Sequence, residues 1–204
     1  MSVAAARKAG LLRHDERDDK TRLAGCDSTG MEAGHVSSYF TRRTGRKKRK
    51  FPKLWAVVAA ASHVCLGMIP GTGPTPDDPQ FHRVAAQAHA REPFQALAAD
   101  CGFDGEEHHE FLHGKLGVLG IIPPERGRPR TKSDTSRRGG FFRNFIHQHW
   151  PKQLYGQRWQ VETFFSMLKR LLDSFLRATN WRSQHREMCL KCLTLNFMLI
   201  AGAG

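Results

Sequence analysis

The stretch YGQRWQVETFFSMLK at residues 155–169 carries the most information about the fold. Four polar residues recur in it with the spacing Tyr-x2-Arg-x3-Glu-x6-Lys, namely Tyr155, Arg158, Glu162 and Lys169. At about 100° per residue on a helix they fall at roughly 0°, 300°, 340° and 320°, so they share one narrow stripe. The opposite side is apolar and predicts a core face, made of Phe164, Met167, Leu168, Leu171 and Phe175. The stretch therefore predicts one long amphipathic helix, which Pro151 can begin.

The polar stripe has a composition that suits phosphate chemistry. Cations and a phenol can contact a nucleic-acid backbone, while a carboxylate can bind a metal ion. The alternative is a surface helix on which Glu162 pairs with a neighbouring basic residue. The spacing by itself leaves both interpretations open.

Two earlier segments each place an aspartate after a short apolar run. The segment LAGCDSTGM at 23–31 predicts a strand that ends at Asp27, followed by a turn in Asp-Ser-Thr-Gly. The segment FQALAADCGFD at 94–104 predicts a buried strand that presents Asp100 and continues into Gly-Phe-Asp. With residues 155–169, these segments resemble the acid-bearing motifs of the DDE transposases of the insertion-sequence 4 and 5 superfamily, in the same order along the chain.

The resemblance runs from about residue 23 to the C-terminus, and it implies a fold. That fold is an α/β protein with a ribonuclease-H-like mixed sheet flanked by helices, in which the first and fourth strands lie side by side. In such a fold Asp27 and Asp100 lie close together, and Glu162 faces them from the packed helix. The apolar runs agree with this order of elements, since they predict paired strands at 51–61 and 63–69, a loop at 70–79 and a helix from residue 80.

The resemblance also implies an activity, namely metal-dependent cleavage and strand transfer at the ends of an insertion sequence. It assigns Asp27, Asp100 and Glu162 as the catalytic residues and as the ligands of Mg²⁺ or Mn²⁺. Two such ions roughly 3.5–4 Å apart can activate the attacking oxygen and stabilise the leaving oxygen. Three converging carboxylates repel one another until a cation binds, so the metal relieves the repulsion.

Basic residues predict how DNA is bound. Tyr155, Arg158 and Lys169 are expected to contact DNA near the scissile phosphate, since Arg grips phosphate with two donors and Lys acts as a point charge. Two basic runs at 42–50 and 126–138 either follow the duplex backbone or are solvated loops. The first run contains three candidate DNA contacts, Arg46, Lys47 and Lys48. The expected partners are the terminal inverted repeats of an element and target DNA, with a homodimer on paired ends by analogy.

Composition is consistent with one basic domain. Of the 204 residues 40% are hydrophobic, which is enough for a core, and the net charge of +13 favours nucleic acid as the partner. No apolar run is long enough to span a bilayer, so no membrane partner is expected. Five scattered cysteines suggest reduced thiols, and the expected location is the cytoplasm, in association with the nucleoid. We expect a flexible charged lead at 1–20 and a ribonuclease-H-like DDE catalytic domain at 21–204.

Three other interpretations remain. The run His109-Glu110-Phe111-Leu112-His113 matches the zinc metallopeptidase pattern, although Gly114 is expected to end that helix at once. Cys189 and Cys192 could form half of a zinc site, but buried thiols are favoured there. Finally, only 26 residues precede Asp27, where members of the family usually carry a DNA-recognition region. The chain could therefore be a truncated, inactive DNA-binding remnant.

Overall fold

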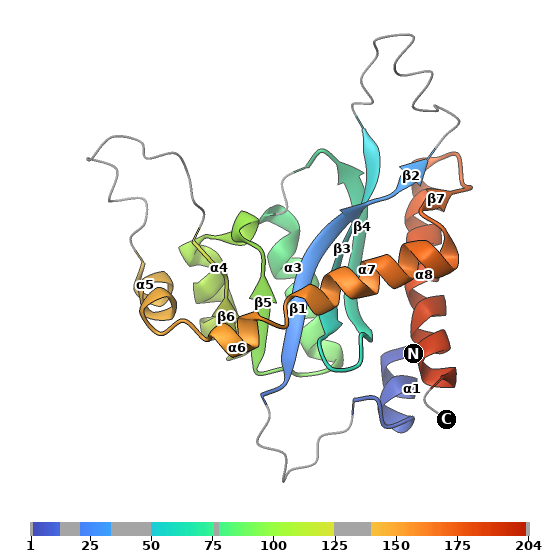
Figure 1. The fold of residues 1–204 in the computed structure, drawn as a ribbon. Helices are drawn as coiled ribbons and strands as arrows, with labels where there is room; N and C mark the ends of the chain where they lie inside the picture. Colours follow the sequence, from blue (N-terminus) through green and yellow to red (C-terminus); the bar gives the residue numbers. More distant parts are fainter. Residues whose placement is uncertain (1, 13–20, 34–49, 76–77, 125–139, 203–204) are drawn as a thin grey trace.

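The centre of the molecule is a mixed sheet of five strands. The computed structural model describes residues 2–12, 21–33, 50–75, 78–124 and 140–202. The strand order is β4-β3-β1-β5-β6, with β3 antiparallel to β1 and β4, and β5 parallel to β1 and β6 (Figure 1). The bounds are β1 (Leu23–Gly30), β3 (Phe51–Ala59), β4 (Cys65–Gly73), β5 (Ala96–Ala99) and β6 (Leu119–Ile121). A separate parallel pair joins β2 (Glu32–Ala33) and β7 (Phe175–Leu176).

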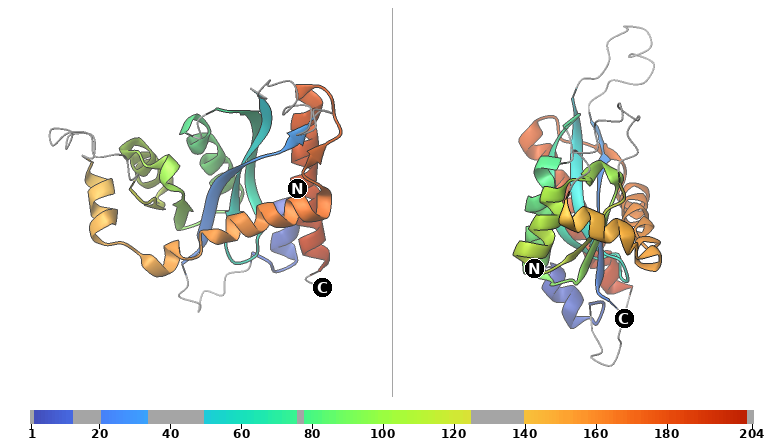
Figure 2. Two further views of the ribbon diagram at one scale, coloured as in Figure 1. Left: turned by 45° about the horizontal axis from the view of Figure 1, so that its top comes forward. Right: turned by 90° about the vertical axis from the view of Figure 1, so that its left-hand side faces the viewer.

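Helices cover both faces of the sheet, as Figure 2 shows. They are α1 (Ser2–Lys8), α3 (Asp78–Arg91), η1 (Cys101–Phe103), α4 (Glu106–Phe111), η2 (Leu112–Leu116), α5 (Phe141–Gln148), α6 (Lys152–Tyr155), α7 (Trp159–Leu172) and α8 (Trp181–Ala201). Successive side chains of β3 point to opposite faces of the sheet, so they contribute to two separate hydrophobic cores. Trp55 and Val57 pack under α3 together with Phe81, whereas Leu54 and Ala56 pack under α7 and α8. None of the described helices has both the length and the apolar character needed to cross a membrane.

This architecture confirms the predicted α/β fold, a mixed sheet flanked by helices. The two paired strands expected after the first basic run are β3 and β4, and the strand expected before Asp100 is β5. In chain order β5 is the fourth strand of the large sheet, and it lies directly beside the first. The loop expected at 70–79 begins later than predicted, because β4 continues through Gly73 and pairs with β3 along its length.

Two local predictions around the acidic residues are wrong. The segment Asp-Ser-Thr-Gly does not turn, since β1 continues to Gly30 and pairs with β3 residue by residue, Asp27 opposite Ala56. Pairing with a long neighbouring strand outweighs the turn preference of these residues. The long helix also starts later than predicted, because α6 ends at Tyr155 and α7 begins at Trp159. The N–H of Arg158 donates to the carbonyl of Tyr155 at 2.9 Å, a tighter turn than an α-helix makes.

The N-terminal prediction also needs correction. Residues 2–8 form helix α1 rather than part of a flexible lead, and α1 packs against α8 near the C-terminus (Figure 1). Val3 and Ala6 are buried there, and the amide of Asn196 donates to the Ser2 hydroxyl at 3.2 Å. Alanine-rich sequence favours a helix, and its small side chains allow the close packing. Residues 13–20 lie outside the described part of the chain.

Candidate active site

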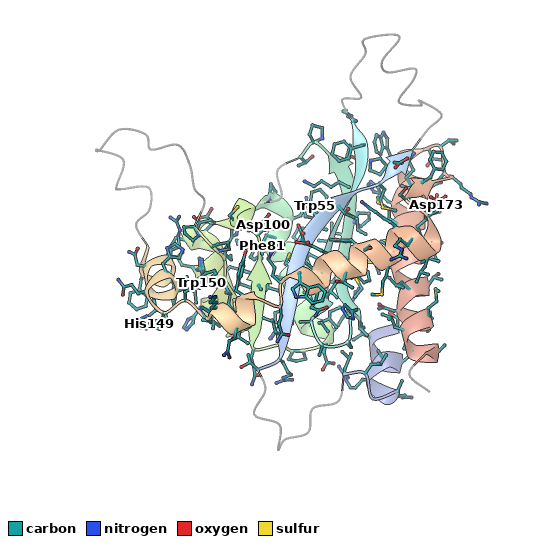
Figure 3. The ribbon with its side chains drawn as sticks, viewed as in Figure 1. Trp55, Phe81, Asp100, His149, Trp150 and Asp173 are labelled. Carbon is teal, nitrogen blue, oxygen red and sulfur yellow. The ribbon has the colours of Figure 1, made fainter. Side chains whose placement is uncertain are left out.

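The two aspartates stand at the same level on neighbouring parallel strands. Cys26 of β1 pairs with Ala99 of β5, so Asp27 and Asp100 each follow a paired residue. Cys26 and Ala99 belong to the core under α3. Because successive side chains of a strand alternate between its faces, Asp27 and Asp100 point to the opposite face, which α7 covers. Figure 3 labels Asp100 beside β1.

Each aspartate is held by a hydrogen bond from the next backbone N–H. Asp27 Oδ1 accepts from Ser28 at 2.7 Å, and Asp100 Oδ1 accepts from Cys101 at 2.7 Å. Asp100 thereby caps η1, the short helix that follows β5. These bonds fix one oxygen of each carboxylate.

Helix α7 lies close against β1, which brings its first turn next to Asp27. A glycine favours this approach, because a Cβ at Gly25 would stand 3.2 Å from Val161 Cβ, a tight contact. Val161 is fully buried in this contact. Glu162 is the next residue along α7, and it is the acid that the resemblance assigns to the helix. Figure 1 shows α7 crossing the sheet from β1 towards α8.

Arg158 joins the acids of the strand and the helix. Its Nη1 lies 3.6 Å from Asp27 Oδ2, and its Nη2 donates to Glu162 Oε1 one turn farther along. Burial lowers the pKa of Arg158, but the surrounding groups, Glu162 before Asp100 and Asp27, raise it above its ordinary value. Asp27 and Glu162 thus contact the same guanidinium, and Asp100 lies near enough for its charge to act on it.

Asp27 has a raised pKa. Burial raises its pKa from 3.8 to about 6. The Ser28 N–H and Arg158 oppose this rise, while the negative charges of Asp100 and Glu162 add to it. The folded protein thus holds a carboxyl group in a place where its ionised form is unfavourable, and a bound divalent cation would remove that penalty.

This raised pKa predicts that protein stability falls as pH rises. The unfolded chain releases the Asp27 proton near 3.8, whereas the folded protein holds it to about 6. Between these values the folded state binds more protons, so the free energy of unfolding decreases with rising pH, by roughly 3 kcal/mol in total. We expect Asp27→Asn to remove this loss, and thus to match the wild type near pH 4 and exceed its stability at about pH 7.

Urea unfolding of both proteins across this pH range, without divalent cations, measures the difference. Glu107→Gln, the same kind of change at an exposed position of α4, is the control and should track the wild type. A difference between Asp27→Asn and the wild type that does not grow with pH would contradict the prediction.

The other predicted DNA contacts lie at different distances from the acids, and some lie outside the described residues. Tyr155 is half-buried against Trp150, with ring centroids 4.8 Å apart, and its pKa is raised by burial first and also by the charge of Asp100. Tyr155 and Arg158 thus lie by the acids despite the break before α7. Lys169 follows Glu162 by two turns, about 10 Å along α7, and forms no hydrogen bond or ion pair within the described residues. Three predicted contacts lie outside the described residues, Arg46, Lys47 and Lys48, as do nearly all of both basic runs.

The structure gives no support to a zinc peptidase site. His109 is buried, and burial lowers its pKa to about 4, whereas Glu110 and His113 are exposed. Gly114 does not end the helix as predicted, because η2 continues to a left-handed Gly117 with φ of 65°.

The Cys-x2-Cys pair supplies free thiols, Cys192 buried and Cys189 half-buried. Among the described residues no three His, Cys, Asp or Glu side chains are grouped so that they could hold a metal ion as they stand.

That last finding also concerns the three acids, two of which contact Arg158. The guanidinium contacts both Asp27 and Glu162, so it stands between two of the three carboxylates. The donor set itself fits Mg²⁺ or Mn²⁺, which prefer carboxylate oxygens and retain several waters. A cation held by Asp27 and Glu162 together would have to displace the guanidinium from these contacts.

One supporting group was not predicted from the sequence. Arg143 of α5 is buried, and its Nε donates to Asp104 Oδ1 at 2.7 Å. The carboxylate of Glu106 accepts from the backbone N–H groups of Phe142 and Arg143, at 2.9 and 3.0 Å, and so caps α5. The segment after Asp100 is thereby tied to the helix that leads into α6 and α7. The Gly-Phe-Asp motif marks Asp104, but no local spacing identifies a partner 39 residues later.

A protein-family model described as "Transposase DDE domain" matches residues 20–197 of this chain. The matched range contains both aspartates, the loop with Asp104 and the whole of α7. A search of curated proteins finds none that matches.

Proposed function

Because the chain belongs to the family of transposase DDE domains, we propose that it cleaves DNA at the ends of an insertion sequence and joins the freed strand to a target. Family membership makes it a transposase, a protein of DNA recombination. The observation that carries the finer proposal is the placement of three acids. Asp27 and Asp100 share one level of two parallel strands, and Glu162 approaches them from α7.

The proposed reaction needs Mg²⁺ or Mn²⁺, which Asp27, Asp100 and Glu162 would hold. When bound, two such ions supply an activated oxygen nucleophile and stabilise the leaving oxygen. The strands keep two of the carboxylates at a fixed separation through the β1–β5 register. The close contact of Val161 with Gly25 keeps the third in reach of them.

The DNA contacts follow from the same surface. Arg158 and Tyr155 border the acids, so they are placed to donate to the oxygens of the scissile phosphate. Lys169 lies about 10 Å farther along α7, which corresponds to about three base-pair steps of duplex DNA. We propose that it contacts the backbone beyond the cleavage point. Assembly as a homodimer on paired ends and binding to target DNA belong to the same proposal.

DNA cleavage on candidate termini tests this function. Duplexes carrying the inverted repeats that flank the coding sequence are incubated with the protein and either Mg²⁺, Mn²⁺ or EDTA. We expect a nick with a new 3′-hydroxyl at the element end, only with the divalent cation, and none on a duplex with the repeat scrambled. Equal, salt-sensitive binding to both duplexes without cleavage would instead identify a truncated, inactive DNA-binding remnant.

Lys169→Gln is expected to weaken DNA binding and to change its salt dependence. Each phosphate contact contributes about −0.9 to the slope of log K against log salt, so the variant should bind less tightly and show a slope smaller by about 1. Fluorescence anisotropy between about 50 and 200 mM salt measures both quantities. Lys115→Gln, at an exposed position of η2, is the matched control with an unchanged slope. Identical slopes for Lys169→Gln and the wild type would show that Lys169 does not contact DNA phosphate.

A further inference from the structure

Arg158 occupies a position that a purely DNA-binding arginine does not need. Its guanidinium contacts Asp27 on β1 and Glu162 on α7, and its side chain is only 19% exposed. It thus serves as the counter-cation of two carboxylates that the proposed function assigns to the metal. An arginine stays charged at any physiological pH, so it does not leave this position by losing its proton.

The guanidinium and a divalent cation compete for the same site. Both are attracted by Asp27 and Glu162, and the two positive charges repel each other at short range. An oxygen that is hydrogen-bonded to Arg158 offers less electron density and less room to a metal ion. Metal binding by all three acids therefore requires Arg158 to turn away, and that movement loses its two carboxylate contacts.

A DNA phosphate offers Arg158 an equivalent set of acceptors. Phosphate oxygens accept two parallel hydrogen bonds from a guanidinium, as a carboxylate does. Arg158 directly precedes α7, in a helical backbone conformation with φ of −55°. Its long side chain can consequently swing from the acids to a phosphate in front of them while α7 stays packed on Gly25.

We propose that Arg158 couples DNA binding to metal binding, by holding Asp27 and Glu162 when DNA is absent and releasing them to the cation when a phosphate takes their place. This inference rests on the proposed function and deepens it. Coupling of this kind is reciprocal, so DNA strengthens the binding of metal and metal strengthens the binding of DNA. Without DNA, the acids stay paired and the site binds divalent cations weakly.

The test measures Mn²⁺ affinity rather than activity. Electron paramagnetic resonance of free Mn²⁺ gives the dissociation constant of the full-length protein, with and without a short duplex. We expect Arg158→Gln to bind Mn²⁺ about tenfold more tightly than the wild type in the absence of DNA. We expect DNA to raise the affinity of the wild type by a similar factor and that of Arg158→Gln hardly at all. Arg158→Lys, which keeps the charge but cannot bridge two carboxylates, should fall between them.

Controls separate this inference from the proposed function. Arg182→Gln, which removes an exposed arginine of α8, should leave Mn²⁺ affinity unchanged. Asp27→Asn combined with Arg158→Gln should abolish the tight binding, which assigns it to this site. Equal Mn²⁺ affinity in the wild type and in both Arg158 variants, all folded by circular dichroism, would overturn the coupling alone. No Mn²⁺ binding in any variant, with or without DNA, would overturn both the coupling and the metal-dependent function.

Discussion

Replacing Glu162 with Gln is expected to slow DNA cleavage by at least about a thousandfold while the protein remains folded. The amide keeps the size of the side chain but removes the negative charge that a metal ligand needs. Loss of several kcal/mol of transition-state stabilisation, about 4 kcal/mol here, corresponds to that factor. The Glu162 side chain is 54% exposed, so the substitution does not disturb the core. Single-turnover cleavage of end DNA with Mg²⁺ measures the rate, and thermal unfolding confirms the fold.

Glu110→Gln is the matched control for this experiment. It makes the same chemical change at an exposed glutamate of α4, outside the group formed by Asp27, Asp100 and Glu162. It is also the residue that would act as general base in the zinc peptidase pattern. We expect Glu110→Gln to cleave DNA at the wild-type rate. Wild-type cleavage by Glu162→Gln would rule out the assignment of the third acid.

The substitution Asp104→Asn is expected to lower the free energy of unfolding by about 3–5 kcal/mol. Asp104 and Arg143 form an ion pair whose side chains are only 2% and 9% exposed. Removing the negative charge takes away the carboxylate that Arg143 Nε and Nη2 contact in the interior, which costs far more than the pair contributes. Because the pair ties the segment after Asp100 to α5, cleavage should also decrease. Urea unfolding monitored by circular dichroism measures the change in stability.

A less buried ion pair provides the comparison. Arg7 of α1 pairs with Glu92, and their side chains are 51% and 13% exposed, so Arg7→Met should cost clearly less than Asp104→Asn. Changing both members of the buried pair, Asp104→Leu with Arg143→Met, should recover part of the loss, since no unpaired charge then remains. If Asp104→Asn cost no more than Arg7→Met, the buried pair would have no special role in holding the segment.

The sequence predicted the parts of the fold that depend on local pattern. Apolar runs with flanking turn residues located β3, β4 and β5, and the order of the elements agreed with the resemblance that placed Asp27 near Asp100. It did not predict that β1 continues beyond Asp27, because the pairing with β3 that extends it is not visible in the segment itself. The match to the transposase DDE family shows the family but does not test the roles of individual residues.

The contacts between residues of the candidate site were harder to predict from the sequence than the identity of those residues. Spacing along a helix places Arg158 and Glu162 on one stripe, yet it cannot say that Arg158 also reaches Asp27 on a strand. The same limit applies to Arg143, whose partner is distant in the sequence. Helical periodicity also missed the break between α6 and α7. The backbone there stays helical, but its N–H groups bond to the carbonyl three residues earlier instead of four.

The order of the three acids along the chain has a consequence during protein synthesis. A ribosome makes β1 and β5 well before α7, so an emerging polypeptide has two of the carboxylates and lacks the third. Such a nascent chain can bury its sheet only on the face that α3 covers, because the α7 and α8 layer is still missing. On the proposed mechanism such a nascent chain cannot cleave DNA. Docking of α7 onto Gly25 then completes the set of three carboxylates, and it can occur only after α7 itself has been translated.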